Sequence, residues 1–221
     1  MRFHIVSLFP GAFDSYLKES IIARAIKAGL VKVDFYNLRD FGLGKHKKVD
    51  GRPYGGGPGM VLAPEPMLKA AASALKKIKS KKTKVLLMSP GGKQFDTAMA
   101  EKLSKYSDLI LISGRYEGID ARVKKILKAE EISVGPYVLT GGELPALAVM
   151  DAVSRKLPGV LGNELSVEER RVSSSEVYTR PEVFEYKKKK YRVPKVLLSG
   201  NHAKMESWKN KTDNKRKLDS R

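Results

Sequence analysis

The sequence predicts an α/β fold with a mostly parallel sheet, followed by a small, basic and mainly helical C-terminal domain. Short apolar blocks at residues 85–88 and 109–112 have the unbroken hydrophobicity of strands that are buried on both faces. Strand-like and helix-like segments alternate up to about residue 157, as in a parallel sheet with helical crossovers. The strands are expected at residues 3–8, 31–38, 84–88, 109–113 and 132–134.

Four helices are indicated between these strands. One is expected at residues 20–28, where Gly29 supplies a stop, and another is expected to begin at Asp96. A longer helix is predicted at 144–156 and is followed by a Pro-Gly pair. The fourth is indicated by apolar residues on one helical stripe, namely Leu68, Ala71, Ala72, Leu75 and Ile78.

The chain divides by composition into a main domain at residues 1–160, an interdomain linker at 161–176 and a basic domain at 177–221. The linker is polar and has no hydrophobic period. About 45 residues with few apolar side chains are too few for an independent core. We therefore expect the C-terminal domain to pack on the main domain or on a partner subunit.

The positive net charge of the chain favours a negatively charged binding partner. The chain carries 43 Lys and Arg against 24 Asp and Glu, a formal net charge of +19, which favours a polyanion. Any single basic run can equally be a solvated face. The basic C-terminal segment, however, also contains Tyr186, Tyr191 and Trp208, and bases stack on aromatic rings while phosphates pair with lysine. This combination favours RNA or DNA as the partner.

Other classes of protein are disfavoured. The chain has no cysteine and only three histidines, so disulfides, thiolate zinc sites and a resident metal are not expected. No stretch approaches the ~18 to 20 apolar residues of a membrane span. The first apolar residues are interrupted at Pro10, too early for a secretory signal peptide. A cytoplasmic location without membrane attachment is expected.

Glycine is concentrated in five segments at the ends of predicted strands, where ligands bind in open α/β sheets: 55–59, 89–92, 114–118, 134–137 and 141–145. Any one of them alone is more often a tight turn. The two common phosphate-binding signatures of nucleotide sites are absent. A cofactor with an adenine but no phosphate chain, such as S-adenosylmethionine, would not need them, and an RNA methyltransferase would also explain the basic surface.

Longer motifs occur in order along nearly the whole chain: Ser-Leu-Phe-Pro at 7–10, Arg-Pro-Tyr-Gly-Gly-Gly-Pro-Gly-Met at 52–60, Gly-Arg-Tyr-Glu-Gly-Ile-Asp at 114–120, Tyr-Val-Leu-Thr-Gly-Gly-Glu-Leu-Pro-Ala at 137–146, Val-Ser-Arg at 153–155, Tyr-Thr-Arg-Pro-Glu at 178–182 and Leu-Leu-Ser-Gly-Asn-His at 197–202. In these motifs the chain resembles the TrmD family of bacterial tRNA (guanine-N1)-methyltransferases, of the knotted SPOUT class.

The resemblance implies transfer of a methyl group from S-adenosylmethionine to N1 of the guanosine 3′-adjacent to the anticodon of tRNA, at tRNA position 37. It also implies a deep trefoil knot in the region of residues 85–147 and a tRNA-binding role for the C-terminal domain. The implied assembly is a homodimer with active sites between the subunits.

The resemblance further implies roles for individual residues. Arg155 would stabilise the negative charge that grows on O6 of the guanine, although an arginine at a helix end can also serve the helix dipole. Asp50 and Arg52 would contact the substrate. The residues implied to bind the cofactor, largely through their backbone, are Ser89, Pro90, Gly114, Tyr116, Glu117, Val134, Gly135, Pro136, Tyr137, Val138, Leu139, Gly141, Gly142 and Pro145.

The chain departs from the family pattern at the general base. The family has an aspartate in the linker, whereas the ungapped position here holds Arg170, which cannot accept a proton. Glu169 is the first candidate to replace it as the base and Glu168 the second. Pro136 also replaces the usual aspartate of the cofactor loop. These departures leave open the alternative of a catalytically weak or inactive RNA-binding protein on the same scaffold.

Overall fold

The computed structural model describes residues 1–162 and 176–219, with side chains of the last helix described up to Asn210. The chain folds as two compact units, Met1–Gly162 and Asn163–Arg221. We call them unit 1 and unit 2 and describe each by itself. Most of the predicted linker, residues 163–175, lies outside the described residues.

Unit 1 is built on a five-stranded sheet in which all strand pairs are parallel, in the order β2-β1-β6-β5-β7. The prediction of an α/β fold is confirmed, and each expected strand is present. The central strand β6 is buried along its whole length because helices cover both faces. The strands are β1 (Arg2–Ser7), β2 (Lys32–Asn37), β5 (Thr83–Gln94), β6 (Asp108–Ser113) and β7 (Glu130–Ser133).

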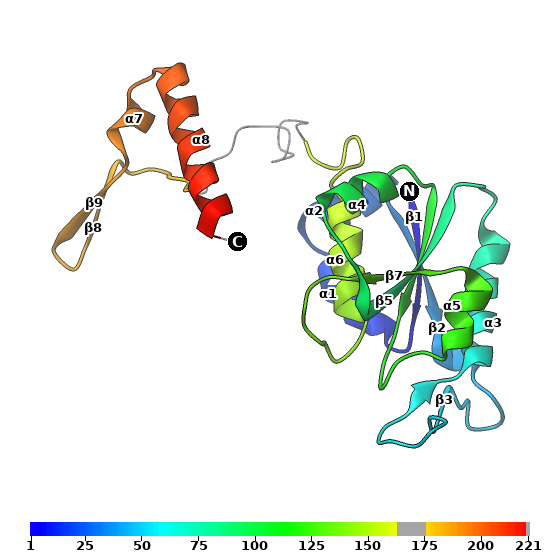
Figure 1. Ribbon diagram of the computed structural model, residues 1–221. Coiled ribbons are helices and arrows are strands. Elements are labelled where there is room, and N and C mark those ends of the chain that lie inside the picture. The colour runs from blue at the N-terminus through cyan, green and yellow to red at the C-terminus, as the bar shows by residue number, and fades with distance from the viewer. Residues whose placement is uncertain (163–175, 220–221) are drawn as a thin grey trace. The chain divides into compact units, whose positions relative to one another are not determined.

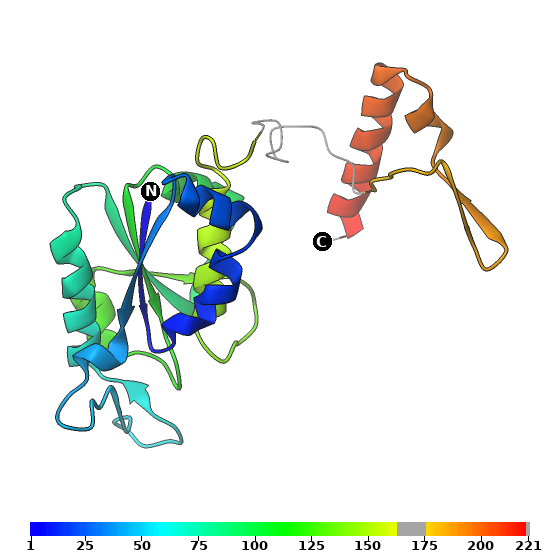
Figure 2. The same cartoon turned by 180° about the vertical axis from the view of Figure 1, so that it is seen from behind.

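Two layers of helices cover the sheet (Figures 1 and 2). Alternate residues of β6 pack into two separate cores, Leu109 and Leu111 into one and Ile110 and Ile112 into the other. The first core lies under η1 (Pro10–Phe13), α1 (Asp14–Leu17), α2 (Ser20–Lys27), α4 (Thr97–Leu103) and α6 (Glu143–Ser154). The second lies under α3 (Pro64–Lys77), α5 (Ala121–Leu127) and η2 (Leu38–Phe41).

The predicted helix boundaries have identifiable physical causes. The Asp96 carboxylate accepts a hydrogen bond from the Met99 backbone N–H at 2.7 Å, which caps α4. Gly29 has φ of +72°, the left-handed conformation that commonly ends a helix, just after α2. These two expectations are confirmed.

The predicted apolar stripe of α3 is partly confirmed, since Ala71 is buried and Leu68 and Ile78 are partly buried and pack against the second core. The residues of α3 that are buried are Pro66, Met67, Ala70, Ala71 and Ala74. Leu75 is 42% exposed, and Ala72 is exposed as well. Three alanines and Met67 provide much of the buried face of α3, and Leu75 is left toward solvent.

Strand β5 is longer than predicted. It was expected to end at Met88, before a loop at 89–92, but it resumes beside β7 after this glycine-containing segment. Met88 and Lys93 both pair with Ile132, so the four intervening residues form a bulge in the strand. A Cβ on Gly92 would lie 2.5 Å from the backbone nitrogen of Ile132, so only glycine fits there.

Unit 2 contains an antiparallel hairpin of β8 (Val183–Tyr186) and β9 (Lys189–Arg192), then α7 (Lys195–Leu198) and α8 (His202–Asp219). The helical tail was predicted, but the hairpin was not. The rings of Tyr178 and Trp208 have centroids 6.2 Å apart and join the start of the unit to α8. Across both units, no helix in the described part of the chain has the length and apolarity to span a membrane.

The bulge in β5 predicts that alanine substitution affects stability differently at two neighbouring glycines. We expect Gly92→Ala to lower the free energy of unfolding by about 1–3 kcal/mol, because its methyl group would overlap the β7 backbone. Gly91 has no atom near the position of a Cβ and no positive φ, so Gly91→Ala serves as the control and should leave stability unchanged or slightly raised. Urea denaturation of the two variants checks this, and equal stabilities would contradict it.

Candidate functional site

A cavity of about 650 Å³ opens at the carboxyl ends of the strands in unit 1. Its walls are the bulge of β5 and the loops that follow β6 and β7, together with the first turns of α5 and α6. Ligand sites in parallel α/β sheets lie at this end of the strands, and the volume suits a ligand of nucleoside size.

The cavity collects nearly all of the residues that were predicted to bind the cofactor. Gly135 and Pro136 are the exceptions and do not line it. The predicted residues that do are Ser89, Pro90, Gly114, Tyr116, Glu117, Val134, Tyr137, Val138, Leu139, Gly141, Gly142 and Pro145. Segments that are far apart in the sequence thus form one cavity, although the role of each residue remains a prediction.

Glycine is required where two of these loops meet. The Gly142 N–H donates a hydrogen bond to the Gly114 carbonyl at 2.8 Å. A Cβ on Gly142 would lie 2.7 Å from both the Gly114 nitrogen and the Ser113 Cα, and a Cβ on Gly141 would overlap the Arg115 side chain. The two loops can approach each other this closely only because neither glycine carries a side chain.

The loop after β6 also contains a strained residue. Tyr116 has φ of +58°, in the left-handed region that bulky residues rarely adopt. Its neighbours hold this conformation, since the Glu117 N–H donates to the Met60 carbonyl at 3.0 Å and the Gly118 N–H donates to the Arg115 carbonyl at 3.1 Å. Strain of this kind is concentrated at functional sites.

A buried carboxylate joins three of the segments. Glu143, the first residue of α6, is only 2% exposed. Its Oε1 accepts a hydrogen bond from the Ser7 hydroxyl at 2.8 Å. Its Oε2 lies 2.9 Å from the Arg115 Nε, but the N–H is not aligned for a hydrogen bond, so the attraction is between charges. Sequence analysis did not single out Glu143 for this role.

Arg115 extends this connection. Its guanidinium lies over the Phe9 ring, 4.7 Å from the ring centroid, and its Nη1 donates to the Thr140 carbonyl at 3.2 Å. Arg115 lines the cavity, whereas Glu143 does not. Ser7 and Phe9 lie at the end of β1, Arg115 follows β6, and Thr140 follows β7, so this one side chain connects the ends of three strands.

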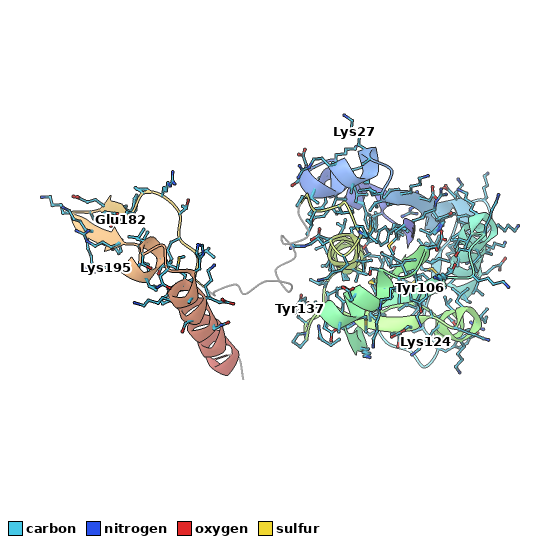
Figure 3. The ribbon with its side chains drawn as sticks, turned by 90° about the horizontal axis from the view of Figure 1, so that it is seen from above. Lys27, Tyr106, Lys124, Tyr137, Glu182 and Lys195 are labelled. Atoms are coloured by element: carbon cyan, nitrogen blue, oxygen red, sulfur yellow. The ribbon has the colours of Figure 1, made fainter. Side chains whose placement is uncertain are left out.

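Charged side chains also line the cavity. Lys124 on α5 forms an ion pair with Glu131 on β7, at 2.6 Å, and both line the cavity. Asp120 caps α5 by accepting a hydrogen bond from the Arg122 backbone N–H, and its hydrogen bonds with the Arg122 side chain lower the pKa of the Asp120 carboxyl. Figure 3 labels Lys124 and Tyr137, which reach this cavity from different elements.

The predicted substrate residues lie on an extension beside the cavity. Asp50 belongs to a short ladder of β3 (Asp50–Gly51) and β4 (Val61–Leu62), and exposed Arg52 follows it. The Leu62 N–H donates to the Gly118 carbonyl at 3.0 Å, which connects the ladder to the loop after β6. The glycine-rich segment 55–59 therefore lies between the two strands of a ladder that contacts a loop of the cavity.

Arg155 lies at the other end of α6. The helix begins at Glu143 beside the cavity and ends at Ser154, so Arg155 is about 18 Å from the helix start along the axis. Burial, reinforced by the Asp151 carboxylate to which Tyr16 hydrogen-bonds, raises the pKa of the Tyr16 hydroxyl, and the nearby Arg155 opposes this shift. Within one chain, the structure does not bring Arg155 to the cavity.

The remaining catalytic candidate, Glu169, lies outside the described residues, as do Glu168 and Arg170. The structure therefore describes the predicted cofactor residues, both substrate residues and Arg155, but not the candidate base.

Comparison with known proteins gives a consistent result. The family model described as tRNA (Guanine-1)-methyltransferase TrmD matches residues 1–221. A tRNA (guanine-N(1)-)-methyltransferase of Clostridioides difficile (strain 630) is 46% identical over 213 residues, 95% of this chain and 90% of that protein. Proteins with the same name from Pseudoalteromonas atlantica and Dehalococcoides mccartyi (strain 195) are 47% and 44% identical, covering 95% and 100% of this chain and 78% and 89% of theirs.

The buried carboxylate predicts an effect on both stability and ligand binding. We expect Glu143→Gln to lower the free energy of unfolding by about 1–3 kcal/mol, because Arg115 loses a buried counter-charge. S-adenosylmethionine affinity should fall at least about threefold. The measurements are thermal unfolding and calorimetric titration.

Glu130→Gln is the matched control for this prediction. Glu130 pairs with Lys84 at 2.7 Å, is more than a third exposed and does not line the cavity, so its removal should cost little. Equal effects of the two substitutions on ligand affinity would show that Glu143 does not organise the cavity.

Proposed function

The chain belongs to the tRNA (guanine-1)-methyltransferase family TrmD, and from this premise we propose that it methylates N1 of the guanosine at position 37 of tRNA. The observation that carries the proposal is the glycine-lined cavity at the carboxyl ends of the strands, into which the predicted cofactor residues converge. The basic composition agrees with a tRNA substrate. We place the reaction in the cytoplasm.

Members of this family use S-adenosylmethionine as the methyl donor, and the cavity suits such a molecule. Apolar side chains such as Leu139 and Pro145 provide surfaces for a flat base, while backbone groups of the glycine loops provide hydrogen bonds that do not require phosphate. We propose that the predicted residues lining the cavity hold the donor, and that Gly135 and Pro136 act by shaping the loop. When bound, the donor supplies an electrophilic methyl group on a positively charged sulfur.

The chain must make N1 of guanine nucleophilic. N1 carries a proton at neutral pH, so a base has to remove it as N1 forms its bond to the methyl carbon. As the base takes the N1 proton, negative charge would grow on O6, and the electron pair of the carbon–sulfur bond would remain on sulfur when N1 bonds to the methyl carbon. A permanently charged, planar guanidinium such as that of Arg155 stabilises this charge.

The position of Arg155 supports a site that is shared between two chains. We propose a homodimer in which Arg155 from one subunit reaches the cavity of its partner, because α6 places the two at opposite ends of the same subunit. Asp50 and Arg52, beside the cavity of the subunit that holds the donor, would contact the target nucleotide. Residues 161–176 would link this subunit to the tRNA-binding domain at 177–221.

We also propose that residues 85–147 form the deep trefoil knot of the SPOUT class. The support is the close interlocking of the segments around the cavity. The bulge of β5 packs against the β7 backbone at Gly92, and the loop before α6 packs against the end of β6 at Gly142.

The general base is proposed to be Glu169. The family position for the aspartate holds Arg170 in this chain, and Glu169 is the adjacent carboxylate with a side chain one methylene longer than that of aspartate. The rest of the proposed site supports an active enzyme over an RNA-binding protein without catalysis, since the cofactor cavity is retained.

The two-chain site predicts complementation between inactive subunits. Arg155→Ala should abolish O6 stabilisation, and Leu139→Arg should fill the cavity, so either homodimer should lose at least about a hundredfold in methylation rate. A mixed dimer of the two variants retains one complete site and should recover roughly half of the wild-type activity.

The measurement is methyl transfer from labelled S-adenosylmethionine to tRNA, with mixed dimers purified through two different tags. Mixed dimers are formed by refolding the two variants together. The controls are the homodimers of each variant, taken through the same refolding. Mixed dimers as inactive as their parents would contradict a site shared between subunits.

The assignment of Glu169 as the base predicts that substitutions of two adjacent glutamates differ in their effect on the methylation rate. Glu169→Gln should lower single-turnover methylation at least about tenfold, because an amide cannot take the N1 proton, while binding of S-adenosylmethionine stays nearly unchanged. Glu168→Gln is the matched control and should remain close to wild type. A wild-type rate for Glu169→Gln would reject Glu169 as the base, and a wild-type chain without methyl transfer would favour the RNA-binding alternative.

A further inference from the structure

The hairpin of unit 2 has one aromatic face. In the β8–β9 pairing, Phe184 is opposite Tyr191 and Tyr186 is opposite Lys189. Cross-strand partners project on the same side of a ribbon, and so do alternate residues of one strand. One face therefore carries Phe184, Tyr186, Lys189 and Tyr191, and we call it the aromatic face.

This face is open to solvent. Phe184, Tyr186 and Tyr191 are 56%, 54% and 50% exposed, whereas Val183 on the opposite face is half-buried. The hairpin projects from the helical part of unit 2 (Figure 1), and Glu182 and Lys195 mark its base in Figure 3. The Val193 N–H donates to the Glu182 carbonyl at 2.9 Å and closes that base. Three neighbouring rings exposed to this extent indicate an interaction surface.

Lysine side chains lie close to the aromatic rings of the hairpin. Residues 187–190 are four consecutive lysines at the turn and the start of β9. The Lys187 Nζ lies 5.5 Å from the centroid of the Tyr186 ring, and the Lys189 Nζ lies 5.7 Å from that of Tyr191. The sole acid of the two strands, Glu185, pairs with Lys190 across the ribbon on the other face. The aromatic face and the turn therefore present only positive charge.

The turn itself is built at a conformational cost. Lys187 and Lys188 have φ of 48° and 62°, the left-handed values of a two-residue hairpin turn. Glycine and asparagine adopt these values readily, whereas lysine is disfavoured there by roughly 1 kcal/mol or more per residue. Lysines at both positions place two cations at the tip where the turn alone would favour uncharged residues.

We propose that the aromatic face of the hairpin is a stacking platform for unpaired bases of the substrate RNA, with the turn lysines binding the adjacent phosphates. The proposal rests on the proposed function, which supplies tRNA as the substrate, and adds the part of the chain and the contacts that hold it. Aromatic rings alternating with cations are the chemistry that binds single-stranded nucleic acid. A protein partner fits less well, because lysine is depleted at protein interfaces.

Stacking and phosphate binding have different salt dependence, which separates them experimentally. We expect Tyr186→Ser/Tyr191→Ser to weaken binding of a tRNA transcript about five- to thirtyfold while the slope of log affinity against log salt stays unchanged. Lys187→Gln/Lys188→Gln should weaken binding and reduce that slope by about 1.4, from roughly 0.7 per phosphate contact on a single strand. Filter binding across a range of salt concentrations measures both.

The conservative variant is the control for stacking. Tyr186→Phe/Tyr191→Phe keeps both rings and loses only the hydroxyls, so its RNA affinity should stay within about twofold of wild type. All variants should retain wild-type affinity for S-adenosylmethionine, because their residues lie in unit 2. A stem–loop RNA with 2-aminopurine at unpaired positions should show quenched fluorescence with the wild-type chain and not with the double serine variant.

Three results would overturn the proposal. The first is an RNA affinity within twofold of wild type for the double serine variant. The second is a change in oligomeric state or unfolding temperature in that variant without a change in RNA affinity, which would make the face a protein contact. The third is that the double serine variant loses binding to anionic lipid vesicles while its affinity for tRNA is unchanged. The binding assays do not require methyl transfer, so an inactive wild-type chain would refute the proposed function without deciding this one.

Discussion

The close contact between the loop after β6 and the loop before α6 is the constraint on which the cavity depends. The Gly142–Gly114 hydrogen bond brings two backbones together at a distance that excludes any Cβ on Gly142. Glu143 then connects the same junction to Ser7 and Arg115. Because this carboxylate is buried, removing its partners would leave its desolvation cost uncompensated, so these contacts stabilise the junction of the strand ends. A cavity stabilised in this way can orient a small donor by backbone contacts.

Local patterns predicted the sheet and the glycine loops at its strand ends, whereas the individual cavity residues were implied by the resemblance to the TrmD family. Unbroken apolar blocks identify buried parallel strands, and glycine clusters identify loops at their ends. The buried face of α3 was predicted only in part, because Ala70 and Ala74 supply much of it and periodicity weights alanines weakly against the exposed Leu75. The role of Glu143 was missed for a different reason. A carboxylate next to glycines in the sequence looks exposed, and only its distant partner Ser7 explains its burial.

The cavity and Arg155 lie at opposite ends of α6 in unit 1, and this separation is the basis of the proposed two-chain site. The cavity lies at the carboxyl ends of the strands, while the single helix α6 carries Arg155 to the other end. No side-chain rotation spans the length of a twelve-residue helix, since an arginine side chain extends only ~7 Å. In the proposed site, which needs both groups, the cavity and Arg155 would come from different chains, and activity would depend on the association of the subunits.

The lysines of the β8–β9 hairpin meet two physical requirements with one set of side chains. A two-stranded ribbon leaves both backbone edges unpaired, and an exposed aromatic face adds a hydrophobic surface, so such a ribbon tends to associate with copies of itself. Four consecutive lysines and Arg192 oppose this association through charge repulsion. The same charges attract phosphate, so the hairpin stays available until RNA supplies both a polyanion and stacking bases. A hairpin with the rings alone would aggregate, and one with the lysines alone would bind any polyanion without contacting its bases.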